Sequence, residues 1–293
     1  MLFRSGLDLT LFDERVSLAL TGYQWTTTDV LLERQLPNSS GFTTAIFNGG
    51  KLRGRGFEAN LEAAPVQTDQ IEWRTATNFA LSRSWTESLP VPEFEVQGFG
   101  FLFGSFVVSE GESLTGMWGN IPTEDRGSRI GKITEARPTF KMGFSNDVSI
   151  GPFNVSALVD YQQGGNVFNL TQLLFDLNGN APACNNILES GISECQRRVQ
   201  EWPTNTSVYI EETTYVKLRE LTLSYTLPNR LVESIGGQSA QVSVSGRNLV
   251  TLTGYSGMDP EVSNFGSQAV GRSVDVAPYP PSRTFWFSFD LSF

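Results

Sequence analysis

The C-terminal segment of the chain alternates between apolar and mostly polar residues with a period of two. Its apolar positions are Phe285, Phe287, Phe289, Leu291 and Phe293. Because successive side chains on a β-strand point to opposite faces, this segment predicts a strand with one apolar and one mainly polar face. The same pattern recurs upstream, so we predict nine strands, at about 5–12, 15–26, 54–64, 71–85, 137–149, 153–163, 214–226, 239–252 and 283–293.

The connections between these strands are alternately short and long. Short links fall at about 13–14, 65–70, 151–152 and 227–238, and long ones at about 27–53, 86–136, 164–213 and 253–282. An antiparallel sheet with short turns at one end and long loops at the other is typical of a bacterial outer-membrane barrel. Most of the predicted strands also exceed the roughly 9 to 11 residues needed to cross a bilayer. We therefore expect an all-β fold, an antiparallel transmembrane β-barrel.

The composition excludes several classes of function. The sequence contains no histidine, which removes His-based acid–base catalysis, Ser-His-Asp nucleophile systems and imidazole zinc sites. A net charge of −10 has the wrong sign for binding nucleic acid. The apolar runs are shorter than the roughly 20 residues of a membrane-spanning helix. We expect no enzyme, no catalytic residue, no cofactor, no metal and no nucleic-acid partner.

Several aromatic residues lie near the predicted strand ends, and they are open to two interpretations. Trp25, Trp85, Tyr215 and Trp286 could form the interfacial girdle of a barrel, where amphipathic rings are favoured. Ordinary packing in a protein core would explain the same positions.

Blocks of sequence along most of the chain resemble the SusC/RagA family of TonB-linked outer-membrane transporters. Four blocks near the C-terminus carry the resemblance most clearly, followed by the terminal Phe293: Tyr215–Pro228, Val244–Leu249, Tyr255–Glu261 and Tyr279–Phe285. Four earlier blocks also look like the family's sequence: Gly6–Phe12, Thr28–Leu32, Asn48–Glu58 and Ser109–Gly119.

The resemblance implies an architecture and partners. Such transporters are 22-stranded barrels that hold an N-terminal plug, so nine strands would be the C-terminal portion, with about thirteen strands and the plug before residue 1. We accordingly expect no plug domain and no signal peptide within 1–293. The family implies uptake of an oligosaccharide or peptide through the outer membrane, with a SusD-like surface lipoprotein and the TonB complex as partners and outer-membrane lipid around the wall.

Two alternatives stay open. One is a TonB-linked receptor for siderophores or cobalamin, which lacks the lipoprotein partner and is disfavoured by the Tyr255–Glu261 block. The other is a secreted carbohydrate-binding β-sandwich, whose apolar faces would point inward to a core.

The terminal strand carries the first site prediction. The outer-membrane insertion machinery, on the resemblance, recognises an amphipathic strand that ends in an aromatic residue. The apolar positions Phe285, Phe287, Phe289, Leu291 and Phe293 are therefore predicted to be a barrel-assembly signal rather than a simple sheet edge.

Three residues in the long loops are candidates for contact with a substrate. Tyr255 and Asp259 lie in a block whose Asp-Pro pair favours a turn, so one interpretation is that they order the loop. The other is that they line the substrate path, since sugars stack on aromatic rings and form hydrogen bonds with carboxylates. Trp118 is open to the same two interpretations.

The two cysteines of the sequence, Cys184 and Cys195, lie in one long loop. We predict a disulfide between them, because that loop faces an oxidising exterior in a barrel of this type. Asp176, Asn178 and Asn180 have the spacing of the first ligands of a calcium loop, but the later positions do not fit. Glu211 and Glu212 point to opposite faces if they lie on a strand, so we interpret them as solvated charges rather than a catalytic pair.

Overall fold

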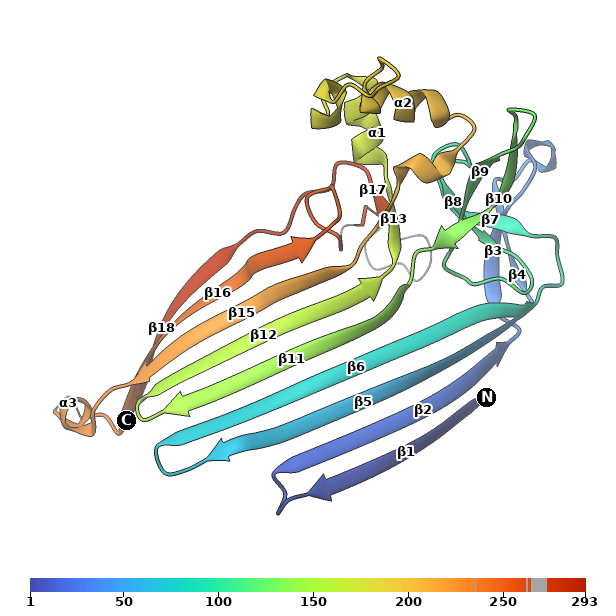
Figure 1. Ribbon diagram of the computed structural model, residues 1–293. Helices are drawn as coiled ribbons and strands as arrows, with labels where there is room; N and C mark the ends of the chain where they lie inside the picture. The colour runs from blue at the N-terminus through green and yellow to red at the C-terminus, as the bar shows by residue number, and fades with distance from the viewer. Residues whose placement is uncertain (235, 262, 265–272) are drawn as a thin grey trace.

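The computed structural model describes the chain except for residues 235, 262 and 265–272 (Figure 1). A nine-stranded antiparallel sheet runs through it, with each strand paired to the next of the nine in chain order. The strands are β1 (Leu2–Leu11), β2 (Val16–Thr28), β5 (Lys51–Gln67), β6 (Ile71–Ser88), β11 (Pro138–Ile150), β12 (Phe153–Gly164), β15 (Tyr215–Thr226), β16 (Ser239–Thr253) and β18 (Thr284–Ser292). The nine predicted strands are confirmed. The sheet is open, and β1 and β18 are its edges.

The pairing register sorts apolar and polar side chains onto opposite faces of the sheet. One row of directly opposed residues crosses six strands, and its members are Trp73, Val148, Val155, Leu223, Val244 and Phe287. The neighbouring row, one residue along each strand, consists of Glu72, Ser149, Asn154, Ser224, Ser243 and Ser288. We call these two surfaces the apolar face and the polar face. Because a one-residue slip would exchange them, the sequence pattern fixes the register.

The apolar face has no protein layer over it in the described part of the chain. Phe287 is 80% exposed and Phe285 is 63% exposed, which is unusual for large apolar side chains in a soluble protein. A sandwich would cover this face with a second sheet, so the structure does not have the arrangement that the β-sandwich alternative requires.

Short turns connect the strands at one end of the sheet. The turn after β1 passes through Phe12, Asp13 and Glu14, all with positive φ. Gly151, with φ 55°, turns the chain between β11 and β12, and α3 (Asn229–Glu233) lies in the link between β15 and β16. The short connections thus lie together, as the sequence predicted.

The long connections at the other end fold into a cap (Figure 1), for which the sequence predicted no regular structure. Its smaller parts are a hairpin of β3 (Leu31–Gln35) and β4 (Thr44–Asn48) around η1 (Asn38–Ser40), and a four-stranded sheet of β7 (Phe94–Gly98), β8 (Ser105–Val108), β9 (Gly116–Pro122) and β10 (Ser128–Glu135). The 164–213 connection contains β13 (Asn166–Asn169), α1 (Leu170–Leu177), η2 (Pro182–Asn185), α2 (Glu194–Glu201), η3 (Thr206–Tyr209) and β14 (Ile210–Glu212). β13 also pairs with β17 (Val274–Asp275).

The main apolar core of the chain lies in this cap and not in the sheet. Its buried residues are Phe106, Met117, Phe168, Leu170, Leu173, Tyr209 and Val274. Polar contacts join its two largest loops: Trp202 Nε1 donates to the carbonyl of Leu102 at 2.7 Å, and Thr206 Oγ1 donates to the carbonyl of Phe101 at 2.9 Å. The cap is therefore packed and held to itself, independently of the apolar face.

The four aromatic residues that were open to a girdle or a packing interpretation do not lie together on one face. Trp25 and Trp286 alternate with apolar-face neighbours and so lie on the polar face, and Tyr215 is buried at 3% exposure. Trp85 lies in register with the apolar face. Phe57, Phe79, Phe140 and Tyr161 form a chain of ring pairs 5.3–6.2 Å apart on the apolar face, and Phe153 and Tyr225 form a further pair there at 4.9 Å.

No helix in the described residues is long and apolar enough to cross a membrane.

Candidate functional site

The polar face of the sheet meets the cap at the outer ends of β11, β12 and β15. Lys141 and Gln162 project from the polar face there, and they line a cleft of about 180 Å³ together with Thr213 and Glu261. The Gln162 amide donates to the carbonyl of Thr213 at 3.0 Å. The strand ends and the 253–282 connection therefore converge on one polar region, which we call the mouth.

A β-bulge positions the charged residues of the mouth. Arg219 is an extra residue of β15 against β12, since Leu158 pairs with Glu220 while the adjacent Val159 pairs with Leu218. Such a bulge re-aims a side chain. Arg219 consequently reaches the polar face, where Nε donates to Asp160 Oδ2 at 2.6 Å.

A buried ion pair joins β15 to the 253–282 connection. Lys217 Nζ donates to both carboxylate oxygens of Asp259 and to Glu261 Oε2, each at 2.7 Å. Lys217 is 4% exposed and Asp259 is 5% exposed. A buried ammonium needs several acceptors to offset its desolvation, and these three oxygens supply them.

Glu261 is the shared acceptor of this cluster. Arg219 Nη2 donates to it at 2.7 Å and the Tyr215 hydroxyl donates to its Oε1 at 2.6 Å. Burial alone raises the pKa of the Glu261 carboxyl, but the hydrogen bonds from Arg219, Lys217 and Tyr215 outweigh it and lower the pKa to about 2. The carboxylate is therefore ionised throughout the neutral range. We call Lys217, Arg219, Asp259 and Glu261 the ionic latch.

A second set of contacts holds the same connection to its own β17 and to β13 and β14. The Tyr255 hydroxyl is hydrogen-bonded to Asp275, and burial followed by that carboxylate raises the pKa of Tyr255. Glu211 Oε2 accepts from the Ser256 backbone N–H at 2.8 Å, and its Oε1 accepts from Asn169 Nδ2 at 2.7 Å. Glu211 is thus an internal acceptor, which corrects its interpretation as a solvated charge.

The residues predicted to lie on the substrate path, Tyr255, Asp259 and Trp118, have different surroundings in the structure. Tyr255 and Asp259 are each 5% exposed, and their polar atoms bond to other residues of the chain. The structure brings both into the latch region, and their contacts favour the loop-ordering interpretation. Trp118 lies apart, in β9 of the cap, opposite Lys132 and Ser105, and its buried indole N–H has no hydrogen-bond partner.

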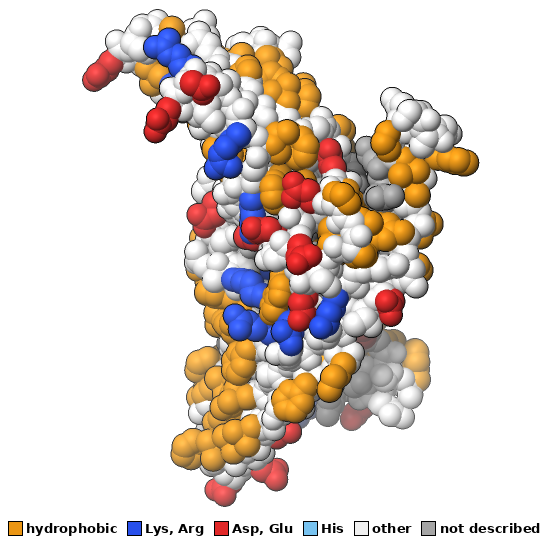
Figure 2. All heavy atoms as spheres, turned by 90° about the vertical axis from the view of Figure 1, so that its right-hand side faces the viewer, with side chains coloured by type: hydrophobic (Ala, Val, Ile, Leu, Met, Phe, Trp, Pro, Cys, Tyr) orange, Lys and Arg blue, Asp and Glu red, His pale blue; other side chains and the backbone are white. Residues whose placement is uncertain are grey.

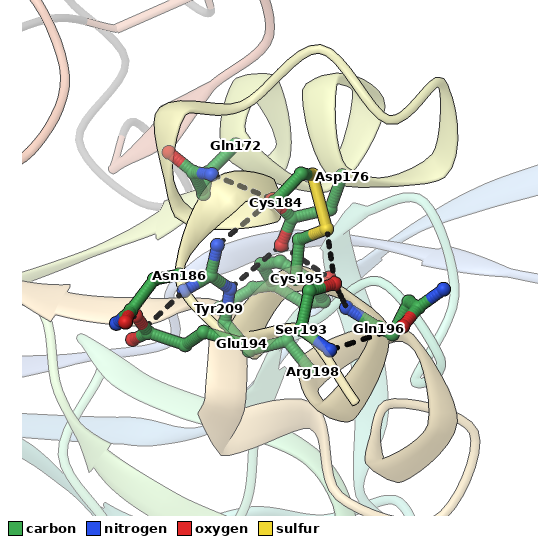
Figure 3. The surroundings of a disulfide bond; sticks show 10 residues. All are labelled: Gln172, Asp176, Cys184, Asn186, Ser193, Glu194, Cys195, Gln196, Arg198 and Tyr209. Atoms are coloured by element: carbon green, nitrogen blue, oxygen red, sulfur yellow. Dashed lines mark hydrogen bonds and ion pairs between the residues drawn. A yellow bond between two sulfur atoms is a disulfide. The ribbon is translucent and has the colours of Figure 1, made fainter. Parts of the chain in front are cut away.

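The two cysteines lie in the 164–213 connection of the cap, and Figure 3 shows their surroundings. Cys184 and Cys195 are joined by a disulfide with their Cα atoms 4.9 Å apart. The bond connects η2 to the first turn of α2, where Ser193 and Gln196 form a capping box. This arrangement anchors a short helix at its N-terminus.

Asp176 lies beside the disulfide and has a partner on each oxygen. Arg198 donates to its two oxygens at 2.6 and 2.8 Å, and the Tyr209 hydroxyl donates to Oδ2 at 3.0 Å (Figure 3). Burial, then the Asp176 carboxylate, raises the pKa of Tyr209. Asp176 and the two sulfurs lie within 4.8 Å of one another, but bonded sulfurs are poor ligands and the arginine neutralises the carboxylate. The calcium-like spacing therefore corresponds to a structural ion pair.

The terminal residues form an edge strand with the predicted alternation. Phe287 and Phe289 of β18 lie opposite Val244 and Val242 of β16, on the apolar face. Phe293 follows the end of β18 and is 77% exposed.

The sequence analysis did not single out Lys217 and Arg219, although both lie inside the Tyr215–Pro228 block. The sequence signal was the presence of two basic residues on one predicted strand and two acidic residues in the Tyr255–Glu261 block. Nothing in the sequence showed that the two blocks lie in contact, because the contact spans more than forty residues.

Comparisons with known proteins find similarity to TonB-dependent receptors. It is 28% identical to TonB-dependent receptor P3 of Formosa agariphila, over 98% of this chain and 33% of that receptor. It is 21% identical to TonB-dependent receptor SusC of Bacteroides thetaiotaomicron, over 99% of this chain and 31% of that receptor. The chain matches no protein-family model.

Solved structures show the same fold. A chain of the RagAB peptide transporter superposes with a TM-score of 0.75 at 20% identity, covering 100% of this chain and 35% of that one. The RagAB peptide importer in its open-open state gives a TM-score of 0.72 at 21% identity. The chain spans about a third of the length of the curated relatives it matches.

Proposed function

Since the chain belongs to the SusC/RagA type of TonB-dependent outer-membrane receptors, we propose that it forms the C-terminal part of the wall, and part of the external mouth, of an outer-membrane transporter. The apolar face meets lipid and the polar face lines the lumen. The open sheet supports this role, because unpaired strand edges in hydrocarbon cost several kcal/mol per group. Further strands therefore complete the wall.

The cargo is an oligosaccharide or a peptide, taken up with energy from the TonB complex and with a SusD-like surface lipoprotein over the mouth. The name of the RagAB peptide importer supports a peptide cargo, and the SusC/RagA resemblance supports a glycan. The role is transport and not catalysis, which agrees with a sequence that has no histidine.

The single observation that carries the proposal is the register of the nine strands. Across six of these strands it places an unbroken apolar row on one face and a polar row on the other, and a wall between lipid and water needs that division.

The function is tested by uptake. We would delete the gene, restore it with wild type, and measure the uptake of labelled oligosaccharides and peptides of graded length. The proposal expects uptake of one class that disappears when TonB is deleted, and a lipoprotein that co-purifies with the receptor. Uptake of an iron–siderophore complex without a lipoprotein would instead support the alternative receptor class.

A further inference from the structure

Two arginines lie directly opposite each other where the apolar face meets the cap. Arg55 of β5 pairs with Arg83 of β6. They share the apolar-face register, because the next pair on the same face is Phe57 with Leu81. Like charges at directly opposed positions destabilise a sheet, so this pair needs a compensating anion.

No carboxylate in the described part of the chain forms an ion pair with Arg55 or Arg83, and both are exposed. Arg55 lies 5.9 Å from the centre of the Trp85 ring. Arg83 Nη1 donates to two backbone carbonyls, those of Ser82 at 3.0 Å and Pro138 at 3.1 Å. Both guanidinium groups are therefore held in place but carry uncompensated charge.

The neighbouring basic residues of β5, unlike Arg55 and Arg83, have a carboxylate partner. Arg53 and Lys51 both lie near Glu87, at 3.6 and 3.3 Å. Figure 2 shows basic side chains gathered at one level of the molecule, with acidic side chains among them and a field of apolar side chains below. Arg55 and Arg83 thus differ from Lys51 and Arg53, whose charges have a carboxylate partner.

A polar cavity of about 900 Å³ lies on the cap side of the two arginines. Both line it, together with Ser113, Thr115 and Asn166. Its two carboxylates already have partners. Glu135 pairs with Lys132 at 2.6 Å, and Glu212 accepts from the Thr214 hydroxyl. The cavity offers hydroxyl and amide groups for a polar, sugar-like ligand.

An apolar groove of about 560 Å³ lies on the membrane side of the same two arginines. Both line it as well, together with Phe3, Phe57 and Leu81. Gly22 forms part of its floor, and a Cβ at Gly22 would meet no atom within 4 Å. The groove is thus open along the apolar face.

We propose that this site, resting on the membrane orientation given above, binds one phosphorylated glycolipid of the outer leaflet. Its phosphate bridges Arg55 and Arg83, its sugar headgroup enters the polar cavity, and one acyl chain follows the groove over Gly22. Guanidinium groups bind phosphate with charge-assisted hydrogen bonds. A free anion would leave the groove unused, whereas an amphipathic ligand occupies both cavities at once.

The test uses the receptor that contains this chain, purified from outer membranes, and native mass spectrometry of bound lipid. The probes are bisphosphorylated lipid A, dephosphorylated lipid A and inorganic phosphate. The variants are R55Q/R83Q, which removes the charges, and G22W, which fills the groove. R74Q is the matched control, since Arg74 is 70% exposed at the opposite end of β6 and pairs with Glu72.

Wild type and R74Q are expected to retain bisphosphorylated lipid A at least tenfold more tightly than R55Q/R83Q. G22W is expected to weaken lipid A but not inorganic phosphate. Equal binding by R55Q/R83Q, equal binding of dephosphorylated lipid A, or full competition by inorganic phosphate would overturn the proposal. Membrane fractionation distinguishes a wrong lipid site from a wrong proposed function. A receptor that is found in the outer membrane but shows no preference for lipid A refutes the lipid site alone.

Discussion

The ionic latch gives a prediction whose size follows from the structure. Lys217→Met removes an ammonium that bonds to three carboxylate oxygens at 2.7 Å. The change leaves Asp259 buried at 5% exposure without its cationic partner. We expect the 253–282 connection to detach from β15 more often, because an unpaired buried charge is strongly destabilising.

The magnitude is at the low end of the range for a broken buried pair. Losing one partner costs roughly 3 to 5 kcal/mol, and Arg219 still neutralises Glu261 at 2.7 Å. We therefore expect about 3 kcal/mol, which raises the population of the detached state roughly 100-fold. The double variant K217M/D259L should recover most of the loss, since apolar replacement of both partners is often close to neutral.

Chymotrypsin cleavage after Tyr255, measured by mass spectrometry on intact cells, reports this detachment. Tyr255 is 5% exposed, so cleavage requires opening, and its rate follows the population of the open form. Lys51→Met is the matched control, because Lys51 forms a partly exposed pair with Glu87 that contributes roughly 0–1 kcal/mol. Cleavage of K217M at the K51M rate, or a double variant that is cut faster than K217M, would refute the reasoning.

Three further predictions concern the cap and the mouth. The hydrogen bonds that Glu261 accepts lower its pKa from 4.5 to about 2, so the stability that this carboxylate contributes is complete above pH 4.5 and is lost as the pH falls towards 2; the cleavage rate after acid exposure should rise over that window. Replacing Cys184 and Cys195 with serine should lower the stability of the cap by up to about 3 kcal/mol, measured by hydrogen exchange of α2, and an unchanged exchange rate would count against it. Gly104→Ala places a methyl group against the ring of Phe168 at φ +99°, and should cost more than Gly100→Ala, which has φ +87° and open space; equal thermal shifts would contradict this.

The sheet could be predicted from sequence because its information is local. The alternation of apolar and polar residues, as from Phe285 to Phe293, indicates a strand and also shows on which face of the sheet each residue lies. The register then follows, since a slip would move Phe287 from the apolar face to the polar face. The alternation also decides between the two interpretations of the aromatic residues: Trp25 and Trp286 are close to strand ends, but their position in the alternation places them on the polar face.

The cap and the latch could not be predicted because their contacts are distant in sequence. Asp176 meets Arg198 and Tyr209 across a folded loop, and Lys217 meets Asp259 across 42 residues. Short strands and helices of four to eight residues give little periodic signal. The cysteine pair was the exception, because two cysteines in one loop allow a single pairing.

The orientation of the sheet is tested most directly by a cysteine scan along β12 in intact outer membranes. Single cysteines would replace Asn154, Ser156 and Asp160 on the polar face, and Val155 and Val159 on the apolar face. A lumen on the polar side and lipid on the apolar side predict that a water-soluble maleimide labels the first three positions and leaves the last two unlabelled. Labelling of all five positions to the same extent, or recovery of the protein in the soluble fraction, would contradict a transporter wall built from this sheet.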